Sequence, residues 1–255
     1  MSLLRAEYRK ISRRMVFPVM TLLLVVFVGL GAFFLIVFGE IAPEAAEGLP
    51  VLEKPEVYEV GAQQAATQTW FPLILSVVLL GGELSTTVWA TSLTRDSRKL
   101  RQVLARFITY SAATLIAFLV AFVFWVIIAL LFAPGEGFMD AEGVIGVVWK
   151  SALIAIAWIA LGTAAVSLLR SVGPAIGAGL AIYFAESFLA LWDPWENVSL
   201  TAASTALFAV DFGGGGFGGF VPGGGLSMPH RLAILAGWTV VGLALTWWGL
   251  QRRDA

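Results

Sequence analysis

The sequence predicts an all-α membrane protein that crosses the bilayer with six transmembrane helices and keeps both termini in the cytoplasm. Of its 255 residues, 59% are hydrophobic and only 13% are charged, which is too few charges to cover a water-exposed surface. Six apolar stretches reach the length of about 20 residues that a helix needs to cross the hydrocarbon core. The charged residues between these stretches alternate in sign along the chain, and this alternation predicts the sidedness.

The six predicted spans cover residues 15–38, 68–94, 107–133, 143–169, 172–192 and 232–250. They leave only short connectors, so we expect one transmembrane domain over residues 1–255. The first span is too long for the apolar segment of a cleaved signal peptide, and we expect it to remain as a helix.

Basic residues gather before the first span and between the second and third spans, whereas acidic residues gather in the other connectors. The positive-inside rule therefore places residues 1–14, residues 95–106 and the C-terminus in the cytoplasm. The basic residues of this side include Arg5, Arg9, Lys10, Arg13, Arg14, Arg170, Arg252 and Arg253. The acidic residues of the opposite side include Glu40, Glu44, Glu47, Glu53, Glu56, Glu59, Glu136, Asp140, Glu142, Asp193, Glu196 and Asp211.

Residues 1–14 are predicted to form an interfacial helix on the inner leaflet. Leu4, Tyr8, Ile11 and Met15 recur at a spacing of three to four and share one face, while basic residues occupy the rest. Such a helix lies in the interface with its apolar face towards the acyl chains. The alternative is a basic flank that only sets the topology.

Residues 95–106 are predicted to form a cytoplasmic loop with a short helix. Its apolar edge consists of Leu100, Val103, Leu104 and Phe107, and its charged surface consists of Arg95, Arg98, Lys99, Arg101 and Arg106. The edge fits a groove on a partner protein, and the charges would steer the approach. The alternative is a basic loop that lies near anionic lipid.

Residues 193–231 are predicted to form an external segment. Residues 197–210 are apolar but too short to span, so we expect a re-entrant or interfacial helix there. Residues 213–225 read GGGGFGGFVPGGG and are expected to form an irregular loop, because glycine disfavours a helix by about 1 kcal/mol relative to alanine.

Three ionisable side chains, Glu83, Lys150 and Glu186, lie inside predicted spans, where a charge must be paired or wetted. Lys150 and Glu186 have similar depths, about 10 Å from the outer end at 1.5 Å per residue, so we expect an ion pair that fixes helix register. A role of this pair in substrate passage is the alternative. For Glu83 we expect a structural hydrogen bond to the basic cytoplasmic loop, with a proton relay as the alternative.

Two further features carry weaker predictions. His230 is the only histidine and the chain has no cysteine, so no metal site is expected. Gly173, Gly177 and Ala181 form a row of small residues that permits close helix contact, either within the subunit or between two subunits.

Two motifs resemble the ABC-2 type ABC transporter permease family. A basic amphipathic helix with a glutamate, LLRAEYRK around Glu7, precedes the first span. Further on come Glu83, Thr86 or Thr87, the pair Ser97–Arg98, and a basic residue, Arg106, that opens the third span. Six spans, a short hairpin after the fourth and a long external segment before the sixth also agree. The sequence departs from the family at Asp96, where proline is common, and at Arg106, where lysine is common.

The resemblance covers the whole chain and implies the transmembrane subunit of an ATP-driven exporter. In that family two permease subunits pair as a homodimer or heterodimer, and each is coupled through its first cytoplasmic loop to a separate ATPase that binds ATP and Mg²⁺. This chain has no G-x-x-x-x-G-K-[ST] motif, so it is expected to bind no nucleotide cofactor and not to be an enzyme. The expected location is a prokaryotic plasma (inner) membrane, with lipid but no nucleic acid as a further partner.

Three other functions can be compared with the features of the sequence. An ion-coupled secondary transporter would show internal repeats with broken helices, and no convincing repeat is visible. A membrane enzyme would need a nucleophile with a base, or metal ligands, and one histidine without cysteine argues against it. A non-transporting assembly or sensory component is compatible with every feature above.

Overall fold

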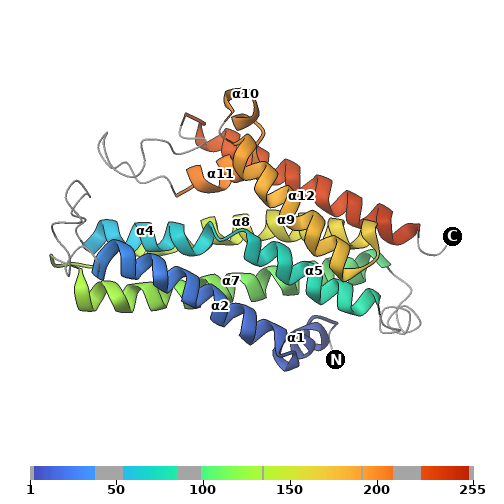
Figure 1. Cartoon of the computed structure of the whole chain (residues 1–255), viewed down its shortest axis with the longest axis horizontal. Helices are drawn as coiled ribbons and strands as arrows, with labels where there is room; N and C mark the ends of the chain where they lie inside the picture. The colour runs from blue at the N-terminus through green and yellow to red at the C-terminus, as the bar shows by residue number, and fades with distance from the viewer. Residues whose placement is uncertain are drawn as a thin grey trace.

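The computed structural model describes residues 3–37, 54–85, 99–133, 135–190, 192–208 and 225–252. In these ranges all regular secondary structure is helical (Figure 1). The elements are α1 (Leu3–Arg13), α2 (Val16–Ala32), the π-helical turn η1 (Phe33–Val37), α4 (Lys54–Ala66), α5 (Trp70–Leu84), α7 (Lys99–Phe132), α8 (Ala141–Leu169), α9 (Val172–Leu189), α10 (Asp193–Glu196), α11 (Leu200–Ala206) and α12 (Met228–Gln251).

The prediction of an all-helical protein with about six apolar spans is confirmed at that level. Five segments are long and apolar enough to cross a membrane: Glu56–Leu84, Leu100–Phe132, Ala141–Leu169, Val172–Leu189 and Met228–Gln251. A sixth is obtained if α1 and α2, which meet at 67°, are counted together. The sidedness of these spans in the membrane stays a prediction.

The second span begins earlier than the apolar run predicts. Helix α4 starts at Lys54, so Glu56 and Glu59 are on a helix and not in an external loop. A break at residues 67–69 separates α4 from α5. Pro72 lies in the first turn of α5, where its missing N–H costs nothing because the first turn has no intrahelical acceptor for it. The last part of the predicted span, residues 86–94, lies outside the described residues.

The third span also begins earlier than predicted. Helix α7 runs without interruption from Lys99 to Phe132 and contains neither glycine nor proline over its 34 residues. The short cytoplasmic helix expected within residues 95–106 is therefore the first two turns of α7.

Helix α8 forms the centre of the bundle and packs most extensively against α12 and α5. Almost every residue from Ile154 to Ser167 is buried. A Cβ at Gly242 of α12 would lie 2.7 Å from the backbone carbon of Ala160, so only glycine allows this close approach of α12 to α8. The hydroxyls of Thr163 and Thr246 share a hydrogen bond of 3.1 Å across the same contact.

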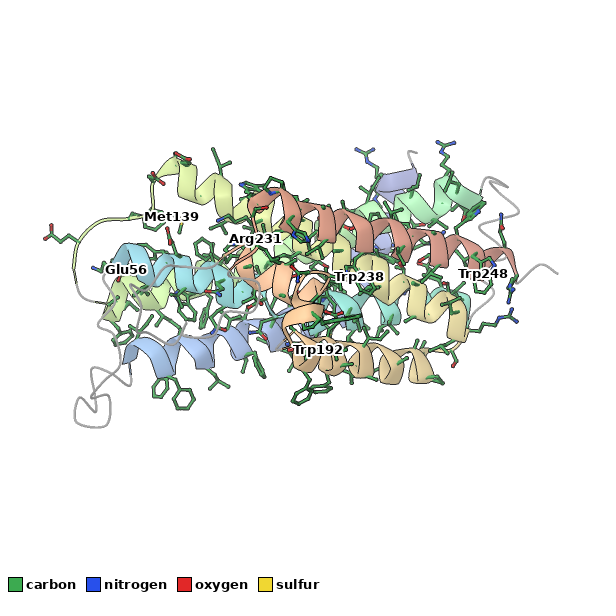
Figure 2. The ribbon with its side chains drawn as sticks, turned by 90° about the horizontal axis from the view of Figure 1, so that it is seen from above. Glu56, Met139, Trp192, Arg231, Trp238 and Trp248 are labelled. Carbon is green, nitrogen blue, oxygen red and sulfur yellow. The ribbon has the colours of Figure 1, made fainter. Side chains whose placement is uncertain are left out.

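The two ends of the bundle differ in charge. Helix α1, the first turn of α7 and the last turn of α12 lie towards one end (Figure 1), where Arg170 Nη2 also donates to the carbonyl oxygen of Arg252 over 3.2 Å. Figure 2 shows Glu56 and Met139 at the opposite end, and Trp248 far from them. Among the described residues, the basic groups of α1 and the acidic Glu56 thus lie towards different ends of the fold.

In the segment predicted to be external, α11 forms within the apolar stretch of residues 197–210. At seven residues it is about 10 Å long and cannot span a bilayer. Leu200 and Ala203 are fully buried, and the indole N–H of Trp158 in α8 donates to Ser204 Oγ over 3.3 Å. The helix therefore packs into the bundle. Residues 209–224, which hold most of the predicted glycine-rich loop, lie outside the described residues.

Candidate functional site

Charged side chains from three separate parts of the chain meet at the basic end of the bundle. We name this group the ionic cluster. It consists of Glu7 and Lys10 of α1, Arg14 between α1 and α2, Glu83 of α5, and Gln102 and Arg106 of α7.

The closest ion pair of the cluster joins α7 to α5. Arg106 Nε donates to Glu83 Oε2 over 2.6 Å, and both side chains are only 2% exposed. Arg106 Nη1 also donates to Gln102 Oε1 over 3.1 Å, one helical turn away. The hydrogen bond expected between Glu83 and the basic segment is therefore present, and its donor is Arg106.

Helix α1 is joined to α5 and α7 through two carboxylates, that of Glu83 and that of its own Glu7. Lys10 Nζ donates to Glu7 Oε1 over 3.0 Å and to Glu83 Oε1 over 3.3 Å. Arg106 Nη2 lies 3.8 Å from Glu7 Oε1, and Arg14 Nη2 lies 3.8 Å from Glu83 Oε1. Because Glu7 and Glu83 each contact two or more of the cations, the three helices are tied by one network and not by separate pairs.

The backbone of α5 takes part as well, because Arg14 Nη1 donates to the carbonyl oxygen of Leu79 over 3.2 Å. Lys10 and Arg14 are each 32% exposed, so water screens their contribution. The buried pair of Glu83 and Arg106 has no such screening. Removing one partner of a buried pair costs about 3 to 5 kcal/mol, since it leaves the other charge uncompensated.

The apolar stripe predicted on the interfacial helix is only partly correct. Tyr8 is 60% exposed and Met15 is 75% exposed, but Ile11 is buried against the bundle. The reason is that Glu7 and Lys10 of α1, followed by Arg14 just after the helix, face the ionic cluster, and Ile11 lies on this same inward face. Leu4 starts the stripe, but its side chain is not among those described.

The predicted apolar edge of the first cytoplasmic loop is also corrected. Leu100 is 53% exposed and Leu104 is exposed too, whereas Val103 is buried at 7%. Arg106, which we expected on the charged surface, is buried in the ionic cluster. Val103 lines a small pocket with residues of α5, α8 and α12, and Arg106 is bonded to Glu83 of α5, so this face of α7 turns into the bundle.

Among the other residues predicted for this loop, Arg101 is exposed on the first turn of α7. Lys99 is the first residue of α7, and its side chain is not among those that the structure describes. Arg95 and Arg98 lie in residues 86–98, which the structure does not describe.

The predicted ion pair between Lys150 and Glu186 is wrong. The buried Glu186 carboxylate accepts from Ser199 Oγ over 2.8 Å, from Trp195 Nε1 over 3.2 Å and from the backbone N–H of Thr201 over 3.3 Å. Lys150 Nζ instead lies 5.3 Å from the centroid of the Phe208 ring. Similar depth in two neighbouring helices does not fix their rotation, and Glu186 finds its donors between α10 and the first turn of α11.

The remaining predicted features have simple surroundings. His230 Nε2 lies 2.9 Å from the backbone oxygen of Asn197, and within the described ranges no three metal-ligating side chains of His, Cys, Asp or Glu come together. Gly173, Gly177 and Ala181 of α9 are exposed. A Cβ at either glycine would meet no atom within 4 Å, so packing within the subunit does not explain the row.

Sequence reasoning missed Lys10, Arg14 and Gln102 as members of the cluster. Two local signals were available: Glu7 and Lys10 are three residues apart, and Gln102 and Arg106 are four apart. Both spacings place side chains on one helical face. The contacts between helices, in contrast, leave no trace in the spacing of residues.

The comparisons with known proteins add no assignment. No protein-family profile matches the sequence, and no curated protein matches it.

Proposed function

We propose that this chain is the transmembrane permease subunit of an ATP-driven exporter of the ABC-2 type. In this proposal it pairs with a second permease subunit and works with a separate ATPase subunit, which binds ATP and Mg²⁺. The resemblance of residues 3–10 and 83–106 to that family supports the proposal. So does the arrangement of these two segments, because the ionic cluster is built from them.

The observation that carries the proposal is the ionic cluster. It links α1, α5 and α7 next to the exposed residues Leu100, Arg101 and Leu104. A force applied to this edge of α7 acts on a helix that is bonded to Glu83 of α5 and to α1. The three helices therefore move together, which is the property that a subunit driven from outside the membrane needs. The apolar pair Leu100 and Leu104 suits a groove on the ATPase.

The pairing with a second subunit is supported by α9. Gly173, Gly177 and Ala181 form an exposed row with open space above both glycines. Small residues at this spacing let two membrane helices approach closely, so that van der Waals contacts and backbone contacts hold them together. A second copy of α9, or the equivalent helix of a related subunit, is the partner that fits this surface.

The proposal is tested by binding to candidate ATPases encoded in the same genome. The variant chain carries Leu100→Asp and Leu104→Asp, both at exposed positions, so its fold is expected to persist. The matched control is Ile145→Asp, at an exposed site near the opposite end of the bundle. Val103→Asp is unsuitable because it would place a carboxylate in the core.

We expect the wild type and the Ile145→Asp control to copurify with one ATPase and to change its rate of ATP hydrolysis. The double variant should lose both effects. An ATPase that is retained equally by the double variant would contradict the proposed coupling. An absence of any effect on ATP hydrolysis by the wild-type chain would favour the non-transporting alternative.

The ion-coupled alternative is not favoured by the surroundings of Glu83. A proton carrier must release its proton to water, whereas Glu83 is 2% exposed and bound by Arg106 and Lys10. Both oxygens of its carboxylate are engaged by these two cations. This arrangement suits a structural link between helices.

A further inference from the structure

A cavity of about 320 Å³ opens at the acidic end of the bundle, between α4, α8 and the end of α11. Its walls include Glu59 of α4, then Glu142, Gly146, Trp149 and Lys150 of α8, and Phe208. Met139, labelled in Figure 2, also lines it and marks its place at that end. The volume is at the lower end of the range of about 300 to 1,000 Å³ that is typical of small-molecule pockets.

Lys150 is the cation of this cavity. It is half-buried, and among the residues that the structure describes its only recorded partner is the Phe208 ring. It lies nine residues after the start of α8, or roughly 14 Å along the helix axis. Helical side chains lean towards the N-terminus of their helix, so the Lys150 chain runs towards Gly146 and Glu142. A cation–π contact leaves its three N–H groups available to an oxyanion.

The opposite charges of the cavity are Glu59 and Glu142, which are more exposed than Lys150. Glu142, Gly146 and Lys150 are spaced by four residues and therefore share one face of α8. Gly146 contributes no side chain, and a Cβ there would meet no atom within 4 Å. Glu59 approaches from α4. Both carboxylates are exposed, and within the described ranges neither has a recorded hydrogen bond or ion pair.

We propose that this cavity binds a small zwitterion of the phosphoethanolamine type, with its phosphate on Lys150 and its ammonium group on Glu59 and Glu142. A simple anion would be repelled by two carboxylates, and a simple cation would be repelled by Lys150. A ligand that carries both charges satisfies all three groups. Trp149 and Phe208 supply the apolar wall for the short carbon linker. The ligand is either the headgroup of a phospholipid or the free solute. The inference is independent of the proposed coupling to an ATPase.

The test measures binding to the purified full-length chain in detergent by titration calorimetry. The soluble probes are phosphoethanolamine, inorganic phosphate and ethanolamine. Phosphoethanolamine should bind about tenfold or more tightly than either fragment, because each fragment leaves one charge unmatched. Short-chain phosphatidylethanolamine and phosphatidylglycerol then distinguish the two sources. If both free phosphoethanolamine and the ethanolamine lipid bind, the site takes the solute, and if only the lipid binds, it takes the membrane headgroup.

Four variants locate the binding. Lys150→Gln should weaken it about tenfold or more, whereas Lys54→Gln, which removes a lysine at the same end outside the cavity, should not change it. Gly146→Leu should block the cavity, and Gly146→Ala should leave binding nearly intact while keeping the helix stable. Thermal unfolding of each variant identifies any that fail to fold.

Measurable binding of phosphate or ethanolamine as tight as that of phosphoethanolamine would overturn the proposal, and so would an absence of binding by every probe, the ethanolamine lipid included. So would equal binding of the two lipids without any binding of free phosphoethanolamine, or equal losses in Lys150→Gln and Lys54→Gln.

Discussion

Replacing Glu83 by leucine should destabilise the protein far more than any exposed substitution on α1. The change leaves Arg106, which is 2% exposed, without the carboxylate that lies 2.6 Å away. Glu7 remains, but its nearest contact with Arg106 is 3.8 Å. The expected loss is about 3 to 5 kcal/mol, the value typical of a buried pair with one partner removed. Glu83→Gln should cost less, because its amide oxygen still accepts from Arg106 Nε.

The assay is unfolding of the purified chain in mixed micelles, followed by circular dichroism. Four proteins form the decisive set: Glu83→Leu, Arg106→Leu, the double variant and the control Arg13→Gln at an exposed position of α1. The double variant should be more stable than either single variant, since it leaves no uncompensated charge in that pair. The control should change stability by less than about 0.5 kcal/mol.

Two results would refute this reasoning. The first is a Glu83→Leu variant as stable as Arg13→Gln. The second is a double variant whose loss equals the sum of the single losses, since additivity means that the two side chains do not interact.

Three further predictions concern the packing of the bundle. Glu186→Leu should destabilise the protein by about 1 to 3 kcal/mol, because it leaves the donors of Glu186 without an acceptor. In unfolding experiments its effect should add to that of Lys150→Met. A strong coupling between the two substitutions would show that Glu186 and Lys150 do form an ion pair. Gly242→Leu should lower the unfolding temperature, because the new side chain would clash with the backbone of α8. Gly237→Leu on the same helix should leave the unfolding temperature unchanged, because a Cβ there meets no atom within 4 Å. Equal unfolding temperatures of the two variants would contradict the close packing of α12 on α8. Gly177→Leu should reduce cross-linked dimer without loss of fold, with Gly237→Leu again as control, and unchanged dimer would remove α9 from the interface.

The helical class and the positions of the spans could be predicted because hydrocarbon imposes one simple requirement on the chain. Each crossing needs about 20 apolar residues with internally bonded backbone, and these runs are visible in the sequence. The starts of α4 and α7 were misplaced because polar residues can continue a helix beyond the apolar run. Lys54 and Lys99 begin helices whose polar first turns carry no hydropathy signal.

The sequence predicted Glu7, Glu83 and Arg106 as site residues, but not the other members of the ionic cluster or its geometry. Glu83 needed a partner, and the basic segment was the nearest source, so Arg106 was within reach of sequence reasoning. The inward face of α1 was not, because Glu7 and Lys10 suit a solvated helix as well as a buried one. The pairing of Lys150 with Glu186 was wrongly predicted for a similar reason. The depth of a residue in a span follows from counting residues, whereas the direction in which its side chain points depends on how the helices pack.

The most direct test of the account is the sidedness of the two charged ends, because an ATPase reaches α7 only if its first turn is cytoplasmic. The chain has no cysteine, so single cysteines can be introduced by Arg101→Cys and Glu142→Cys, both at exposed positions. A membrane-impermeant maleimide applied to intact cells should label Glu142→Cys at once and Arg101→Cys only after the cells are permeabilised. Labelling of both in intact cells, or of Arg101→Cys alone, would contradict the account.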